Sequence, residues 1–135
     1  MSSNSFLVND YHELIALQRV FREAKFCFEA SDPEISASPI VARLFDRLLD
    51  TLIEVDVTRK GDIARKRWAD WLSMHPAREE WQVSVRRAAE EHDWDHWSED
   101  ERISYARTLL SPFILAQDLI ELFIEEVSTA RHTEE

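Results

Sequence analysis

The sequence predicts an all-α fold, namely a single-domain bundle of five or six helices with no β-sheet. Apolar residues recur at helical spacings of three and four through most of the chain. Serine, aspartate and proline stand at the starts of these periodic segments, where they favour helix capping. Gly61 is the only glycine, and this disfavours β-hairpins and phosphate-binding loops, which use glycine for backbone conformations with positive φ. A chain of 135 residues is long enough for one core, so we expect one domain over 1–135 with partly flexible ends at 1–9 and 131–135.

Six periodic segments carry these helix signals. The predicted helices cover residues 10–30, 39–57, 62–74, 77–93, 99–111 and 112–130. Asp10 and Glu13 have the spacing of a capping box, which opens the first helix. Ser38 followed by Pro39 opens the second, because proline fits the first position of a helix. Gly61 then supplies the turn that separates the second helix from the third.

The later helices are predicted from the same kinds of signal. Asp62 caps the third helix, and Pro76 opens the fourth. Ser98 and Glu101 form a second capping box at the start of the fifth helix. Pro112 removes one backbone hydrogen-bond donor, so we expect it either to kink the helix or to restart it.

The last predicted helix carries two apolar stripes, although a helix on the surface of a bundle needs only one. The second stripe consists of Leu115, Leu119 and Leu122. An apolar stripe that the fold does not cover favours contact with another chain. Homodimerisation through these leucines is therefore one hypothesis from the sequence.

Composition predicts a soluble protein of the cytoplasm. The apolar run at residues 6–8 is too short for a signal peptide or a membrane span, so we expect no membrane partner. Cys27 is the only cysteine and cannot form an intramolecular disulfide, which is typical of a reducing compartment. The net charge of −11 also favours solubility.

Charge is distributed unevenly along the chain. Residues 1–58 carry a formal charge of −5, residues 59–87 carry +4 and residues 88–135 carry −10. The central cations concentrate in a basic stretch that consists of Arg59, Lys60, Arg65, Lys66 and Arg67. Nucleic-acid binding through this stretch is an alternative, although acidic residues in the following helix disfavour it. We expect instead that the basic stretch pairs with the acidic C-terminal third or with an acidic partner.

His92 and His96 are the candidate metal ligands. Two histidines four positions apart share one face of a continuous helix and can chelate a metal ion there. A metal-dependent enzyme that uses this pair is therefore a second alternative. A complete site needs a third ligand, and neither Glu-x-x-His repeats nor a nucleophile with an adjacent base accompany the histidines. We therefore predict no catalytic residues and no cofactor, and we disfavour an enzyme.

Trp94 and Trp97 lie in an acidic connection, and tryptophan is enriched among the residues that anchor protein interfaces. Together with the leucine stripe, they are the predicted interaction residues; the alternative is that they close the end of the bundle. The leading hypothesis is a non-enzymatic acidic protein that binds another protein, as inhibitors, immunity proteins, antitoxins and assembly or regulatory factors do. Its partner would carry a basic face, because opposite charge speeds encounter.

Overall fold

Seven α-helices and one short 3₁₀ helix make up the computed structural model of this chain, which describes residues 4–133. They are α1 (Tyr11–Lys25), α2 (Glu34–Ala37), α3 (Pro39–Lys60), α4 (Asp62–Leu72), α5 (Glu79–Ala89), η1 (Trp94–His96), α6 (Glu99–Leu110) and α7 (Gln117–Thr133). The all-α prediction is confirmed over the described residues, and the predicted count of five or six helices is too low.

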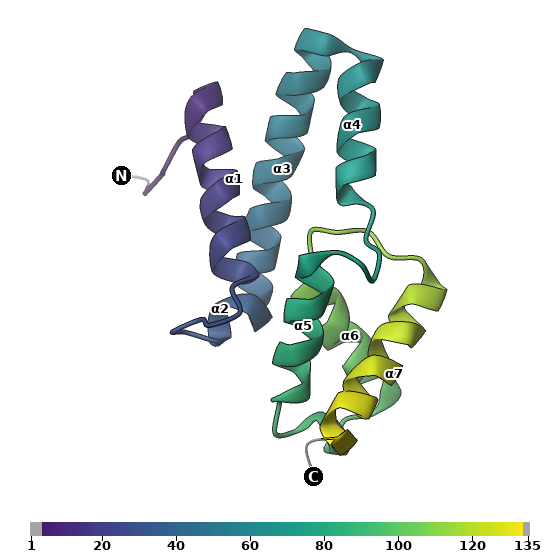
Figure 1. Cartoon of the computed structure of the whole chain (residues 1–135). Coiled ribbons are helices and arrows are strands. Elements are labelled where there is room, and N and C mark those ends of the chain that lie inside the picture. Colours follow the sequence, from purple (N-terminus) through teal and green to yellow (C-terminus); the bar gives the residue numbers. More distant parts are fainter. Residues whose placement is uncertain (1–3, 134–135) are drawn as a thin grey trace.

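The helices form two neighbouring groups (Figure 1). In one group, α1 and α4 both pack against the long helix α3, and the turn between α3 and α4 lies at one end of the molecule. In the other group, α5, α6 and α7 pack against one another, with both α6 and α7 in contact with α5. The short helix α2 joins the groups, because it contacts α1, α3 and α6.

The predicted first helix ends five residues early, at Lys25 instead of residue 30. The chain then forms α2, which the sequence analysis did not predict. Local polar contacts hold this helix: the Asp32 carboxylate accepts a hydrogen bond from Glu34 N at 3.1 Å, and Ser36 Oγ donates to Pro33 O at 3.0 Å. A helix of four residues is too short to show an apolar period, which explains why the pattern did not reveal it.

Helices α3 and α4 form a helical hairpin. The second predicted helix extends three residues further than expected, to Lys60, and Gly61 ends it with a φ of 68°. Residues with a side chain rarely adopt this backbone conformation, so glycine is favoured at the turn. Helix α4 ends at Leu72, two residues before the predicted end.

Pro112 neither kinks nor restarts a helix, which corrects the prediction for the last two helices. Helix α6 ends before it, and α7 begins only at Gln117. Between them, Ile114 N donates to Leu72 O at 2.7 Å, and Ile114 O accepts a hydrogen bond from Met74 N at 3.1 Å. This isolated bridge is the only β-type pairing in the part of the chain that the structure describes. The backbone here therefore pairs with a distant segment instead of continuing a helix.

The predicted fourth helix, 77–93, is α5 and is shorter at both ends. It ends at Ala89, after which a connection with η1 turns the chain inward at Trp94. The fully buried side chains of the core come from both groups of helices. They include Phe45, Leu52, Trp81, Trp94, Leu109, Leu110, Ile120, Phe123 and Val127. None of the helices within residues 4–133 is both long and apolar enough to span a membrane.

Candidate protein-binding surface

An open groove of about 380 Å³ lies between α5 and α7. The residues that line it are Gln82, Val85, Leu122, Glu125, Glu126, Thr129 and Ala130. They recur at helical spacing on both helices, so the groove follows one face of each helix instead of a loop.

The groove has an apolar floor and an acidic rim. Val85, Leu122 and Ala130 are half-buried and pack against the core, whereas Glu125 at the rim is exposed. Under the floor, the buried indole of Trp81 donates from Nε1 to Glu126 Oε2 at 2.6 Å. This hydrogen bond fixes one rim carboxylate in place, so part of the site is pre-organised.

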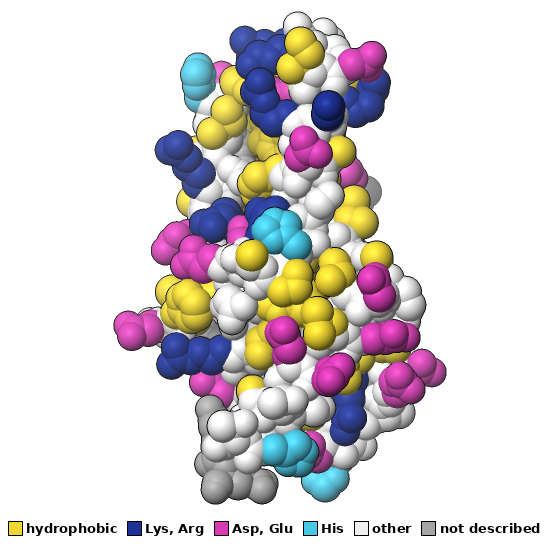
Figure 2. Space-filling view, turned by 45° about the vertical axis from the view of Figure 1, so that its right-hand side comes forward, with side chains coloured by type: hydrophobic (Ala, Val, Ile, Leu, Met, Phe, Trp, Pro, Cys, Tyr) yellow, Lys and Arg dark blue, Asp and Glu magenta, His cyan; other side chains and the backbone are white. Residues whose placement is uncertain are grey.

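Acidic side chains continue beyond the groove along the exposed face of α7. Asp118, Glu121 and Glu125 lie three and four residues apart and are all exposed. Figure 2 shows hydrophobic side chains gathered near the middle of the molecule, with acidic side chains beside them. An apolar patch with an acidic border is typical of a surface that binds a partner of opposite charge.

The predicted leucine stripe does not lie on one helix. Leu119 and Leu122 belong to α7, but Leu115 precedes it in the extended segment. All three leucines are half-buried and pack against the core. Of the three, Leu122 is the one that lines the groove, so the second stripe is in large part core packing.

The two tryptophans of the acidic connection pack at the end of the bundle. Trp94 is 0% exposed, and Arg102 stacks over its ring at 5.3 Å and donates from Nε to Trp94 O at 2.9 Å. Trp97 is half-buried, with its ring 4.9 Å from that of Tyr105. A fully buried Trp94 cannot anchor a partner, which corrects its assignment as an interaction residue. The connection folds inward because burial of this large apolar ring is favourable, and the acidic neighbours of Trp94 stay exposed to water.

The two candidate metal ligands do not share a helix face. Helix α5 ends at Ala89, so His92 lies in a turn and His96 in the short helix η1. The assumption of a continuous helix is therefore wrong. Within residues 4–133, no three or more His, Cys, Asp or Glu side chains form a group that could hold a metal ion.

The basic stretch lies at the turn of the α3–α4 hairpin, and its five cations are exposed. Within residues 4–133, the expected pairing with the acidic C-terminal third does not occur. Among the described residues, its single ion pair is the local one between Arg65 and Asp62 at 2.5 Å. Arg59 instead stacks over the ring of Tyr11 at 4.6 Å. The α3–α4 turn and α7 belong to different groups of helices, which explains why these charges do not meet (Figure 1).

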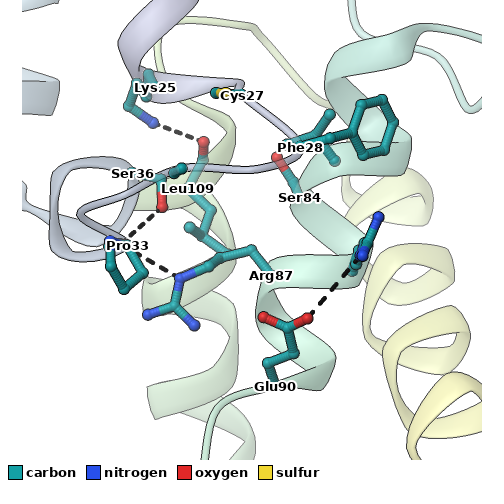
Figure 3. A pocket seen from close by; sticks show the side chains of 12 residues that line it. Lys25, Cys27, Phe28, Pro33, Ser36, Ser84, Arg87, Glu90 and Leu109 are labelled. Carbon is teal, nitrogen blue, oxygen red and sulfur yellow. Dashed lines mark hydrogen bonds and ion pairs between the residues drawn. The ribbon is translucent and has the colours of Figure 1, made fainter.

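A second, smaller cavity of about 60 Å³ lies beside the last residue of α1 (Figure 3). Lys25 and Cys27 line it from one side, and Ser84 and Arg87 of α5 line it from another. Lys25 is 1% exposed and its Nζ donates to Thr108 O at 2.7 Å and Leu109 O at 2.6 Å. Burial lowers the pKa of this amine to about 7. Through these two hydrogen bonds, Lys25 links the end of α1 to the last turn of α6.

A buried charge cluster joins α1 and α5 and was not predicted. Glu80 is 4% exposed and accepts hydrogen bonds from Arg22 Nε and Arg78 Nη2, both at 3.2 Å. Arg78 also donates to Ser73 O at 3.2 Å, just after the end of α4. Lys25 lies on the same face of α1 as the buried Leu14, so helical spacing in the sequence already indicated that it could be buried. No feature of the sequence distinguishes Glu80 from the many acidic residues of the surface.

Comparisons with protein families, with curated proteins and with solved structures found no match for this chain.

Proposed function

We propose that this chain is a non-enzymatic protein that binds another protein through the groove between α5 and α7, as inhibitors, immunity proteins, antitoxins and assembly or regulatory factors do. The observation that carries the proposal is the combination of an apolar floor at Val85 and Leu122 with the carboxylates of Glu125 and Glu126 at the rim. Such a groove favours a partner that brings both apolar and basic side chains.

The acidic face of α7 would act mainly on the rate of encounter. Exposed carboxylates attract a basic partner over distances of about one Debye length, roughly 8 Å at physiological salt. The apolar floor would then slow dissociation, because its half-buried side chains lose their remaining contact with water. Added salt should therefore reduce the association rate more than it changes the dissociation rate.

Affinity purification from native cells, followed by mass spectrometry, tests the proposal. A stoichiometric partner should be recovered by the wild type and by Glu54→Lys, and Glu125→Lys should recover at least about threefold less of it. The two substitutions change net charge equally and both replace exposed glutamates, but only Glu125 lines the groove. Equal recovery by both variants, or the absence of any stoichiometric partner, would contradict the proposal.

Nucleic-acid binding is a second candidate, favoured by the exposure of all five cations of the basic stretch at one end of the molecule. A gel-shift titration with duplex DNA and single-stranded RNA at increasing salt tests it. Charge reversal of Arg65 and Arg67 should abolish a salt-sensitive shift if the basic stretch contacts phosphates. The metal-enzyme alternative has less support, because His92 and His96 do not lie on one helix.

Homodimerisation stays a hypothesis. Light scattering coupled to size exclusion at high protein concentration tests it, and Leu122→Asp should shift a dimer towards monomer if the groove is the contact. A strict monomer at high concentration would contradict it.

A further inference from the structure

We infer that the α5–α7 groove receives one amphipathic helix of the partner protein, with apolar side chains facing the floor and Lys or Arg facing the rim. This inference rests on the proposed function and adds the conformation and the chemistry of the bound segment.

The walls of the groove favour a helix over an extended peptide. Both walls are α-helices, whose backbone N–H and C=O groups within each helix are already paired. An extended segment would find no main-chain partners here, and its own backbone groups would stay unpaired in the contact. A helix satisfies its backbone internally and presents only side chains. A polyproline segment is disfavoured as well, because no aromatic side chain lines the groove.

The size of the groove matches about two turns of a helix. Its lining on α7 extends from Leu122 to Ala130, nine residues whose eight steps rise about 12 Å along the helix axis. A partner helix that lies along this length would place side chains at i, i+3, i+4 and i+7 over the floor. Val85, Thr129 and Ala130 are small, which allows two helices to approach to the usual distance of about 8–10 Å between axes.

The charges of the groove indicate which charged side chains the partner helix carries. Two carboxylates and no lysine or arginine lie among the described residues that line it. Glu125 is exposed and forms no ion pair within residues 4–133, so a cation of the partner can reach it without displacing another. Lys or Arg beside the apolar face would meet these carboxylates at the edge of the contact, where charge selects the orientation of the helix.

A synthetic amphipathic helix of leucine and lysine tests the inference on the full chain; it is about 20 residues long, because isolated helices below about 15 residues are only marginally stable in water. Two control peptides replace lysine by glutamate or scramble the order so that the leucines no longer share a face. Amide chemical shifts of the ¹⁵N-labelled protein, followed during titration, give both the affinity and the location of binding. We expect the leucine–lysine peptide alone to shift signals of residues 82–85 and 122–130.

Two matched pairs of variants sharpen the test. Thr129→Trp fills the groove and should weaken peptide binding at least tenfold, whereas Thr51→Trp, which also replaces an exposed helical threonine, should leave it unchanged. Glu125→Lys should weaken binding at least threefold, and Glu54→Lys should not. Thermal unfolding of each variant confirms that it is folded.

The inference is overturned if the glutamate or scrambled peptide binds equally well, if Thr129→Trp has no effect, or if the shifted signals lie elsewhere. The proposed function is tested separately by the native partner. If recovery of that partner depends on Glu125 while the leucine–lysine helix does not bind, the helical mode is wrong and the protein-binding function stands.

Discussion

Lys25 Nζ donates a hydrogen bond to Leu109 O at 2.6 Å, so the last residue of α1 caps the last turn of α6. The final carbonyls of a helix lack donors within the helix, and the negative end of the helix dipole favours a cation. A second bond to Thr108 O strengthens this contact. Because the two helices are far apart in the sequence, Lys25 joins segments that only the folded chain brings together.

Replacement of Lys25 by methionine should destabilise the protein by about 2 kcal/mol at pH 10.5. At this pH the folded amine is neutral and the unfolded amine is largely so, and the variant therefore mainly loses two hydrogen bonds, each worth about 1 kcal/mol. Urea unfolding followed by circular dichroism measures the change. Lys60→Met, at an exposed position, serves as the control and should stay within about 0.5 kcal/mol of the wild type. An equal effect of both variants would show that Lys25 does not link α1 to α6.

The difference in stability between wild type and Lys25→Met should shrink as pH falls from 10.5 to 9, and its sign should reverse towards pH 7. Burial lowers the pKa of Lys25 from its usual 10.5 to about 7, so between these values the unfolded chain binds more protons than the folded one. The contribution of Lys25 therefore rises with pH across this window, by at most about 1.4 kcal/mol per pH unit. Burial also raises the pKa of Tyr105 to about 12, but both proteins contain this tyrosine, so its titration cancels in the difference. A difference that does not vary with pH would mean that Lys25 keeps its ordinary pKa.

Glu80→Gln should destabilise the protein by about 1–2 kcal/mol. The neutral side chain would leave the guanidinium groups of Arg22 and Arg78 without their shared anion, and water screens part of this loss because the two arginine side chains are 36% and 15% exposed. Chemical denaturation at pH 7 measures the loss. Glu79→Gln is the matched control: its side chain is 61% exposed and lies 3.9 Å from Arg22, and we expect its effect to stay below about 0.5 kcal/mol. Similar effects at both positions would contradict a structural role for the buried carboxylate.

Trp94→Ala should destabilise the protein by about 4 kcal/mol, because it removes a fully buried ring from the core. Trp97→Ala should have a smaller effect, since that side chain is half-buried. Thermal or urea unfolding compares the two variants. Trp94→Phe keeps most of the apolar volume and should recover part of the loss, which separates packing from partner binding. If Trp94→Ala is as stable as the wild type, Trp94 does not contribute to the core as its burial indicates.

The helical class could be predicted from the sequence because its causes are local. The capping hydrogen bonds expected for Ser98 and Glu101 are both present, and Asp10 and Ser38 also cap their helices as expected. These interactions join residues three positions apart, so the sequence order already contains them. The prediction failed where a distant segment competes with the helix. Around Pro112, the backbone pairs with residues 72 and 74, and no local pattern could indicate that pairing.

Only part of the candidate site could be predicted from the sequence. Leu122 was assigned to an interaction surface, but the opposite wall of the groove, Gln82 and Val85, comes from α5, about forty residues earlier. The pairing of His92 with His96 assumed a continuous helix that burial of Trp94 interrupts.

The amino-acid order by itself determined the helical class and the approximate position of the longer helices, because capping and periodicity act over a few positions. Only the tertiary structure decided which acidic side chains border an apolar groove, which lysine is buried and which tryptophan is withdrawn from the surface. These outcomes depend on which helix faces meet, and that is set by packing over the whole chain.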